Sequence, residues 1–101
     1  MVTVIIKKEN NHIKSITLFG HAKFDIHGKD IVCAAISSSV ITTVNGIKKL
    51  NDNVKVDQLT DKLIVKPKNK DKTTNVLLLN LVDLLEELSN DYPKNIKIKE
   101  E

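Results

Sequence analysis

IVCAAISSSVITTVNGIKK, residues 31–49, contains the clearest helical pattern in the chain, and the rest of the fold is arranged around it. Its apolar residues recur at steps of four, four and three, which places their side chains on one face of an α-helix. These residues are Ile36, Val40, Val44 and Ile47. Asp30 precedes the pattern and is a typical N-cap, because its carboxylate can accept a hydrogen bond from a backbone N–H of the first turn. We therefore predict a helix from residue 31 to about Lys49 with one buried face.

A hairpin is predicted on the N-terminal side of this helix. Residues 2–7 and 13–20 are rich in β-branched side chains, which favour strands. Asn10 and Asn11 lie between them, and asparagine tolerates the positive φ of a tight turn. Residues 22–29 show no period, so we predict a loop that leads into the helix.

Two more strands and a second helix are predicted on the C-terminal side. Residues 54–56 and 63–66 are typical of short strands joined by a turn over residues 57–61, and Pro67 ends the second strand because it has no N–H to donate. The second helix, over residues 74–90, has apolar side chains on much more than one face. This surplus predicts a further burial partner, a second copy of the chain.

The sequence predicts one α+β domain that covers residues 1–101. A last strand is expected around Ile96 and Ile98, so the order is strand-strand-helix-strand-strand-helix-strand. We expect one sheet with two helices packed on it. A chain of 101 residues, 41% of them hydrophobic, can bury one core of this kind.

Composition argues against several classes of function. All sixteen basic residues are lysines, and only 3% of residues are aromatic. Because arginine and stacking aromatics carry most nucleic-acid recognition, we expect no direct nucleic-acid binding. No apolar run approaches the roughly 20 residues of a membrane span, so we expect no membrane association. One cysteine cannot form an internal disulfide, which favours a reducing cytoplasm.

The chemistry of the chain is expected at Cys33 and His21. Cys33 lies in the first turn of the predicted helix, where unsatisfied backbone N–H groups favour the thiolate and lower the pKa of the thiol. His21 lies twelve positions earlier, after Gly20, whose missing side chain allows another backbone to approach closely. If the two side chains meet, the imidazole can activate the thiol and protonate a leaving amine. The N–H groups of Cys33 and Ala34 are candidate oxyanion donors.

Asp30 and Ser37 are candidate supporting residues. Asp30 is expected to cap the helix, and it could also orient His21. Ser37 lies one helical turn after Cys33, so it either donates a hydrogen bond near the site or is a small residue that lets the loop pack closely. A metal site would draw on His21, His27, Cys33 and either Asp25 or Asp30. That spacing matches no standard zinc pattern, so we expect no metal and no cofactor.

Two segments together resemble a known family, the ribosomal-processing cysteine proteases (Prp family) of bacteria. They are Gly20-His21-Ala22 and Gly28-Lys29-Asp30-Ile31-Val32-Cys33-Ala34-Ala35-Ile36-Ser37. The resemblance extends over the whole chain to the ending Tyr92-Pro-Lys-Asn-Ile-Lys-Ile.

The resemblance implies an endopeptidase that removes a short N-terminal extension from a large-subunit ribosomal protein during ribosome maturation. It implies that His21 and Cys33 are catalytic, that Asp30 and Ser37 support them, and that the protein is a homodimer. It also implies a loop that orders over the peptide, formed by Lys23, Phe24, Asp25, Ile26, His27 and Gly28. Two loop residues depart from the family pattern: Lys23, where a smaller or acidic residue is usual, and His27, where an aromatic such as tyrosine is common.

Two other functions are compatible with the sequence. In the first, the chain is a non-catalytic ribosome-associated binding module whose lysine-rich loops meet RNA, and Cys33 belongs to the core. In the second, it is a thiol redox protein, which is disfavoured because no second cysteine can resolve an oxidised Cys33.

Overall fold

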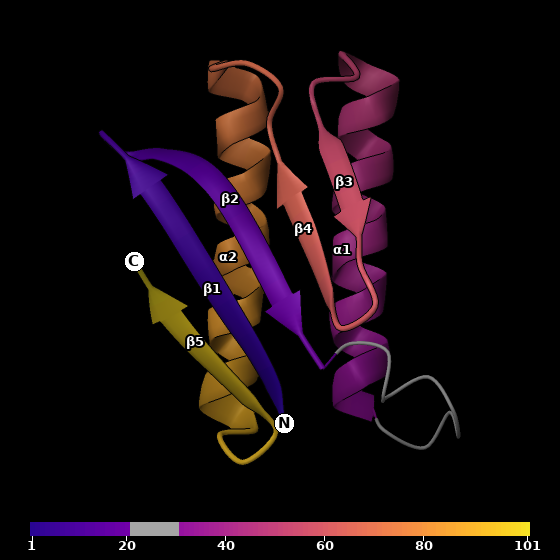
Figure 1. The fold of residues 1–101 in the computed structure, drawn as a ribbon, viewed down its shortest axis with the longest axis vertical. Helices are drawn as coiled ribbons and strands as arrows, with labels where there is room; N and C mark the ends of the chain where they lie inside the picture. Colours follow the sequence, from indigo (N-terminus) through magenta and orange to yellow (C-terminus); the bar gives the residue numbers. More distant parts are fainter. Residues whose placement is uncertain (21–30) are drawn as a thin grey trace.

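The computed structural model describes residues 1–20 and 31–101 and contains seven elements in the predicted order (Figure 1). They are β1 (Val2–Glu9), β2 (His12–Phe19), α1 (Ile31–Leu50), β3 (Lys55–Gln58), β4 (Lys62–Lys66), α2 (Lys72–Asp91) and β5 (Ile96–Glu100). The prediction of one α+β unit with a single sheet and two helices is confirmed.

The five strands form one mixed sheet in the order β3-β4-β2-β1-β5. β1 and β5 are parallel, and the other neighbours are antiparallel. Figure 1 shows α1 and α2 side by side behind the sheet, on the same face. The other face of the sheet is therefore not covered by any element in the described part of the chain. We call it the open face.

The hairpin between β1 and β2 forms as predicted. Asn10 and Asn11 have φ values of 50° and 67°, the left-handed region that a tight hairpin turn requires. The pairing register shifts between Lys7 and Lys8, which marks a β-bulge. β1 continues past this bulge to Glu9 rather than ending at Lys7, because the tight turn lets the last residues of both strands pair.

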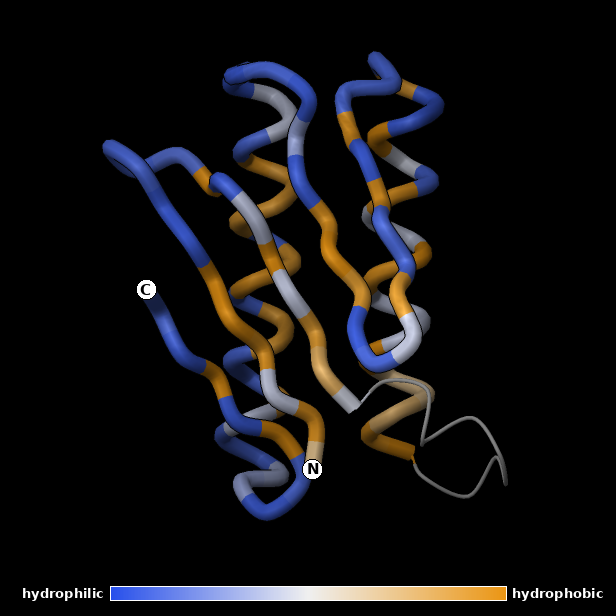
Figure 2. The backbone as a smooth tube through the Cα atoms, in the orientation of Figure 1, coloured by the Kyte–Doolittle hydropathy of each residue, from blue (hydrophilic) through white to orange (hydrophobic). Residues whose placement is uncertain are grey.

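The core lies between the sheet and the helices. The predicted stripe of α1 is confirmed, since Ile36, Val40, Val44 and Ile47 are all buried. Figure 2 shows the hydrophobic parts of the central strands lying over hydrophobic parts of both helices. Alternate strand residues face this layer: Val2, Val4, Ile6, Ile16, Leu18, Leu63 and Val65.

α1 is by length and composition apolar enough to cross a membrane, contrary to the expectation that no run approaches that length. The reason is that residues 31–47 contain no charged side chain, and small alanine, serine and threonine residues fill the positions between the larger apolar ones. Its apolar stripe is buried against the sheet, together with Val32 and Cys33. A helix buried in a protein core can be as long and as apolar as a membrane-spanning helix, and the packing against the sheet accounts for the composition of α1.

The second half of the chain follows the prediction with shifted boundaries. β3 begins and ends later than predicted, at Lys55–Gln58, so the turn to β4 is shorter than residues 57–61. α2 begins at Lys72 rather than near Thr74, because the carboxylate of Asp71 accepts hydrogen bonds from the N–H and hydroxyl of Thr74 at 3.0 and 2.8 Å. Most of the apolar side chains outside the main buried face of α2 are covered by this chain itself, since Leu77, Leu79 and Leu88 pack against its hydrophobic core. Val76 and Leu84 are the exposed exceptions, at 55% and 39%.

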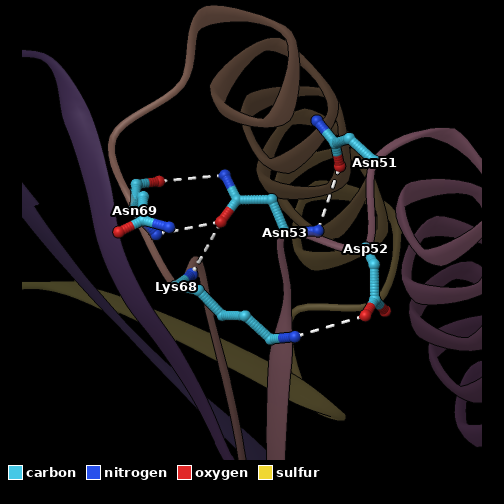
Figure 3. A network of polar contacts seen from close by, with 5 residues as sticks. All are labelled: Asn51, Asp52, Asn53, Lys68 and Asn69. Atoms are coloured by element: carbon cyan, nitrogen blue, oxygen red, sulfur yellow. Dashed lines mark hydrogen bonds and ion pairs between the residues drawn. The ribbon is translucent and has the colours of Figure 1, made fainter.

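Asn53 fixes the lysine-rich segment between β4 and α2 (Figure 3). Its amide oxygen accepts from the backbone N–H groups of Lys68 and Asn69 at 3.0 and 2.9 Å, and its amide nitrogen donates to the carbonyl of Asn69 at 2.9 Å. The same nitrogen donates to the hydroxyl of buried Thr74 at 3.0 Å. One buried side chain thus satisfies several backbone groups of a loop that has no ladder of its own.

Candidate functional site

Cys33 is the third residue of α1 and is 3% exposed. In the first turn of an α-helix the backbone N–H groups have no partner within the helix, and they carry the positive end of its dipole. This confirms the predicted placement of the thiol at a helix N-terminus. The side chain lies on the same stripe as Ile36 and Val40, directed toward the sheet.

Ser37 and Ala34 take two different environments on α1. Ser37 is half-buried and lies one turn after Cys33 on a neighbouring position of the helix surface. Ala34 is exposed, on the side of the helix away from the core. Ser37 therefore lies within one helical turn of the thiol, whereas the side chain of Ala34 is exposed and only its backbone can contribute to the site.

Gly20 ends β2 with a φ of 81°, a conformation that L side chains rarely adopt. Its N–H donates to the carbonyl of Asp61 at 3.5 Å, which joins the end of β2 to the turn between β3 and β4. Figure 1 shows that the end of β2 and the first turn of α1 lie at the same end of the molecule. The glycine predicted from its small size is therefore also needed for its backbone conformation.

The remaining predicted site residues lie outside the described residues. They are His21, Asp30 and the loop residues Lys23, Phe24, Asp25, Ile26, His27 and Gly28. The pairing of His21 with Cys33 and the capping role of Asp30 stay predictions.

A groove that the sequence did not predict begins one turn from Cys33. It has a volume of about 230 Å³ and lies between α1 and the β3-β4 hairpin. Ser37 lies at its wall together with apolar and amide side chains: Val40, Ile41, Val44, Asn45, Val56, Gln58 and Leu63. Ile41 is 58% exposed and Val56 is 37% exposed, so the wall is apolar and open to solvent. Its residues come from three elements, and no local pattern in the sequence joins them.

Charged groups cluster at the other end of α1. Hydrogen bonds from Thr74 lower the pKa of Asp71, and the nearby ammonium groups of Lys14 and Lys70 lower that of Glu9. Within residues 1–20 and 31–101, no group of three or more histidine, cysteine, aspartate or glutamate side chains could hold a metal ion. The candidate site in the described residues therefore consists of the cysteine at the start of α1 and the apolar groove next to it.

A family model described as cysteine protease Prp matches residues 1–97. The chain belongs to this family. A relative, the ribosomal processing cysteine protease Prp of Mycoplasma genitalium, is 36% identical over 88 residues, which are 81% of this chain and 83% of the relative. Membership of the Prp family makes the chain a cysteine protease, as the resemblance implied.

Solved structures of Prp share this fold. The essential ribosomal processing protease Prp from S. aureus in complex with a substrate peptide has a TM-score of 0.87 and 21% identity, with all of both chains covered. The same protease with a covalently linked product peptide has a TM-score of 0.85 and 23% identity, again over all of both chains. At these identities the likeness concerns the fold of the Prp domain.

Proposed function

We propose that this protease removes a short N-terminal extension from a large-subunit ribosomal protein, with Cys33 as nucleophile and His21 as general base and acid. The observation that carries the proposal is a cysteine in the first turn of α1 in a chain of a cysteine protease family. The name of the 36% identical relative supports the choice of a ribosomal protein as substrate.

The position of Cys33 suits the first half of the reaction. The thiolate would add to the scissile carbonyl carbon, and the backbone N–H groups of Cys33 and Ala34 would donate to the oxyanion that forms. As the C–N bond breaks, the imidazolium of His21 would protonate the leaving amine, which leaves a thioester on Cys33. Water would then attack the thioester while His21 accepts its proton, which restores the thiolate and the imidazolium.

The groove beside Ser37 supports the binding of an extended peptide. β3 is an edge strand of the sheet, so a peptide can lie along it without displacing another strand. Val56 projects from β3 into the groove, and Ile41 faces it from α1. An apolar side chain of the substrate would remove these exposed groups from water.

We also propose that two copies of the chain form a homodimer and that the protein is located in the cytoplasm. Val76 and Leu84 support the homodimer, because two exposed apolar residues two turns apart on α2 have no partner within the described part of this chain. The cytoplasm is supported by the substrate, a component of the ribosome.

The test is cleavage of a peptide that spans the extension junction of the precursor, followed by mass spectrometry. Cys33→Ala should lower the rate by about 10⁴-fold or more, because the nucleophile is lost. Ser38→Ala is the matched control, since Ser38 is exposed on the same helix, and its rate should equal that of wild type. Cleavage by Cys33→Ala at the wild-type rate would remove Cys33 from the mechanism.

The burial of Cys33 favours a second candidate, a binding module in which the thiol belongs to the core. Alkylation separates the two functions. A catalytic thiol should react readily with iodoacetamide near neutral pH, whereas a core thiol should react only when the protein is unfolded.

A further inference from the structure

The open face of the sheet is organised in three rows of paired residues. Directly paired residues share a face, and Thr3 pairs with Phe19 and Lys97. Phe19 pairs in turn with Lys62, which completes the first row. The side chains of this row point away from the helices, because each has at least one neighbour along its strand that is buried in the core: Val2 and Val4, Leu18, Leu63 and Ile96.

The second row repeats this arrangement, and the third consists of two separate pairs. In the second row Ile5 pairs with Thr17 and Lys99, and Ile64 pairs with Thr17 and Asp57. The third row contains Lys7, which pairs with Ser15, and the direct pair of Lys66 and Lys55.

Six lysines and one acidic residue, Asp57, lie on these rows. The lysines are Lys7, Lys55, Lys62, Lys66, Lys97 and Lys99. Six ammonium groups against one carboxylate leave a net charge of +5 on these three rows. Lys66 lies 3.9 Å from Asp57, and no other lysine of the six forms an ion pair in the described residues. The charge is therefore concentrated and mostly uncompensated.

The centre of the open face is apolar beneath the lysines. Ile5, Ile64 and Phe19 are each half-buried although no element covers them. The ammonium of Lys62 lies 5.7 Å from the centroid of the Phe19 ring, so its aliphatic stem covers part of the sheet while its charge faces solvent. A surface with one cation over an aromatic ring and five further lysines on the same rows is suited to a polyanion that also carries planar groups.

We propose that the open face binds RNA through its phosphate backbone. Like charges disfavour a second copy of the chain on this face, because two-fold pairing would place the lysine rows of one copy against those of the other. The choice of RNA among polyanions rests on the proposed function, since a ribosomal protein precursor is encountered beside ribosomal RNA. Without arginine and with one ring, the contact would be independent of base sequence and sensitive to salt.

RNA binding on the open face differs from what composition predicts, which is that the chain binds no nucleic acid. Composition reports the absence of arginine and the small net charge of the whole chain, and both argue against a binding site. It does not show that strand pairing collects six of the sixteen lysines on one side of the sheet.

The experiment measures fluorescence anisotropy of a labelled single-stranded oligoribonucleotide of about 20 nucleotides at several salt concentrations. If five phosphates are neutralised, the logarithm of the affinity should fall against the logarithm of salt with a slope of about −3.5. The double variant Lys62→Glu and Lys97→Glu should weaken binding about tenfold or more and reduce the slope toward about −2. Lys62→Gln with Lys97→Gln is the second variant and should give a smaller loss in the same direction.

The matched control is Lys72→Glu with Lys94→Glu, which changes the net charge equally at exposed positions outside the open face. It should bind RNA within about twofold of wild type. Three results would each overturn the proposal. The first is an equal loss of RNA affinity in both glutamate pairs, and the second is no RNA binding by wild type at about 50 mM salt. The third is binding to phosphatidylglycerol vesicles without binding to RNA. Cleavage of the free junction peptide is measured in parallel. Its loss would count against the proposed function, whereas the RNA titration is decided independently.

Discussion

At the scale of single residues, the polar side chain of Asn53 stabilises the fold by holding the loop between β4 and α2 in place. It is 8% exposed, and its amide contacts Lys68, Asn69 and Thr74. A buried amide with both donors and its oxygen satisfied stabilises the loop, whereas its removal leaves backbone groups without partners. The connection between β4 and α2 therefore depends on one side chain rather than on regular structure.

We predict that Asn53→Ala lowers the free energy of unfolding by about 2–4 kcal/mol, because the buried hydroxyl of Thr74 and three part-buried backbone groups lose their partner at once. Asn69→Ala is the control, since Asn69 contributes only its backbone N–H and carbonyl to this network (Figure 3). It should change stability by less than about 0.5 kcal/mol. Urea unfolding followed by circular dichroism measures both. Equal destabilisation by the two variants would show that the amide of Asn53 is not what holds the loop.

At the scale of elements, the start of α2 is stabilised by the ionised carboxylate of Asp71. The hydrogen bonds from Thr74 lower the pKa of this group, so its folded pKa lies below its unfolded value of about 3.9. A depressed folded pKa contributes stability above the unfolded pKa, and this contribution is lost as pH falls through the folded pKa.

We predict that Asp71→Asn is less stable than wild type at neutral pH and that the difference shrinks as pH falls below about 4. Urea midpoints at several pH values measure this difference. Asp83→Asn, at an exposed position within α2, is the control and should be within about 0.5 kcal/mol of wild type at neutral pH. A gap between wild type and Asp71→Asn that stays constant down to about pH 2 would contradict the assigned role.

The groove between α1 and β3 leads to a prediction about substrate binding. Ile41→Lys places a charge on its apolar wall and should raise KM for the junction peptide about tenfold, with kcat changed less, because Ile41 lies two turns from Cys33. Thr42→Lys adds the same charge at the next exposed position of α1, outside the groove, and should leave KM unchanged. Steady-state cleavage assays measure both constants. If both variants change KM equally, the peptide does not use this groove.

The periodicity of apolar residues predicted the helices and strands of this chain well, because each of them has its own local pattern of apolar and turn residues. The stripe of α1 and the Asn10-Asn11 turn are direct examples. The groove and the contacts of Asn53 could not be predicted, because they join residues from elements whose relative positions depend on the order of strands in the sheet. The placement of Cys33 in the first helical turn followed from the pattern. The partner predicted for it, His21, lies in residues 21–30, outside the described part of the chain.

At the scale of the whole molecule, the two sides differ in what they offer to a partner. The open face has a net charge of +5 on its rows, whereas α2 exposes Val76 and Leu84 on the opposite layer. Self-association through the open face would bring like charges together, and association through α2 would bury apolar side chains. A dimer formed through α2 would therefore leave the open face available to RNA in both copies.

We predict that Val76→Ser with Leu84→Ser converts the proposed dimer to a monomer at concentrations where wild type is dimeric, because the exposed apolar area on α2 is lost. Ile5→Ser is the matched control, since it removes an apolar side chain of similar size from the open face. It should remain dimeric in sedimentation velocity experiments. The reverse result, with Ile5→Ser monomeric and the α2 variant dimeric, would place the interface on the sheet. The lysine rows would then be buried between two copies, and the same measurement would also remove the surface proposed for RNA.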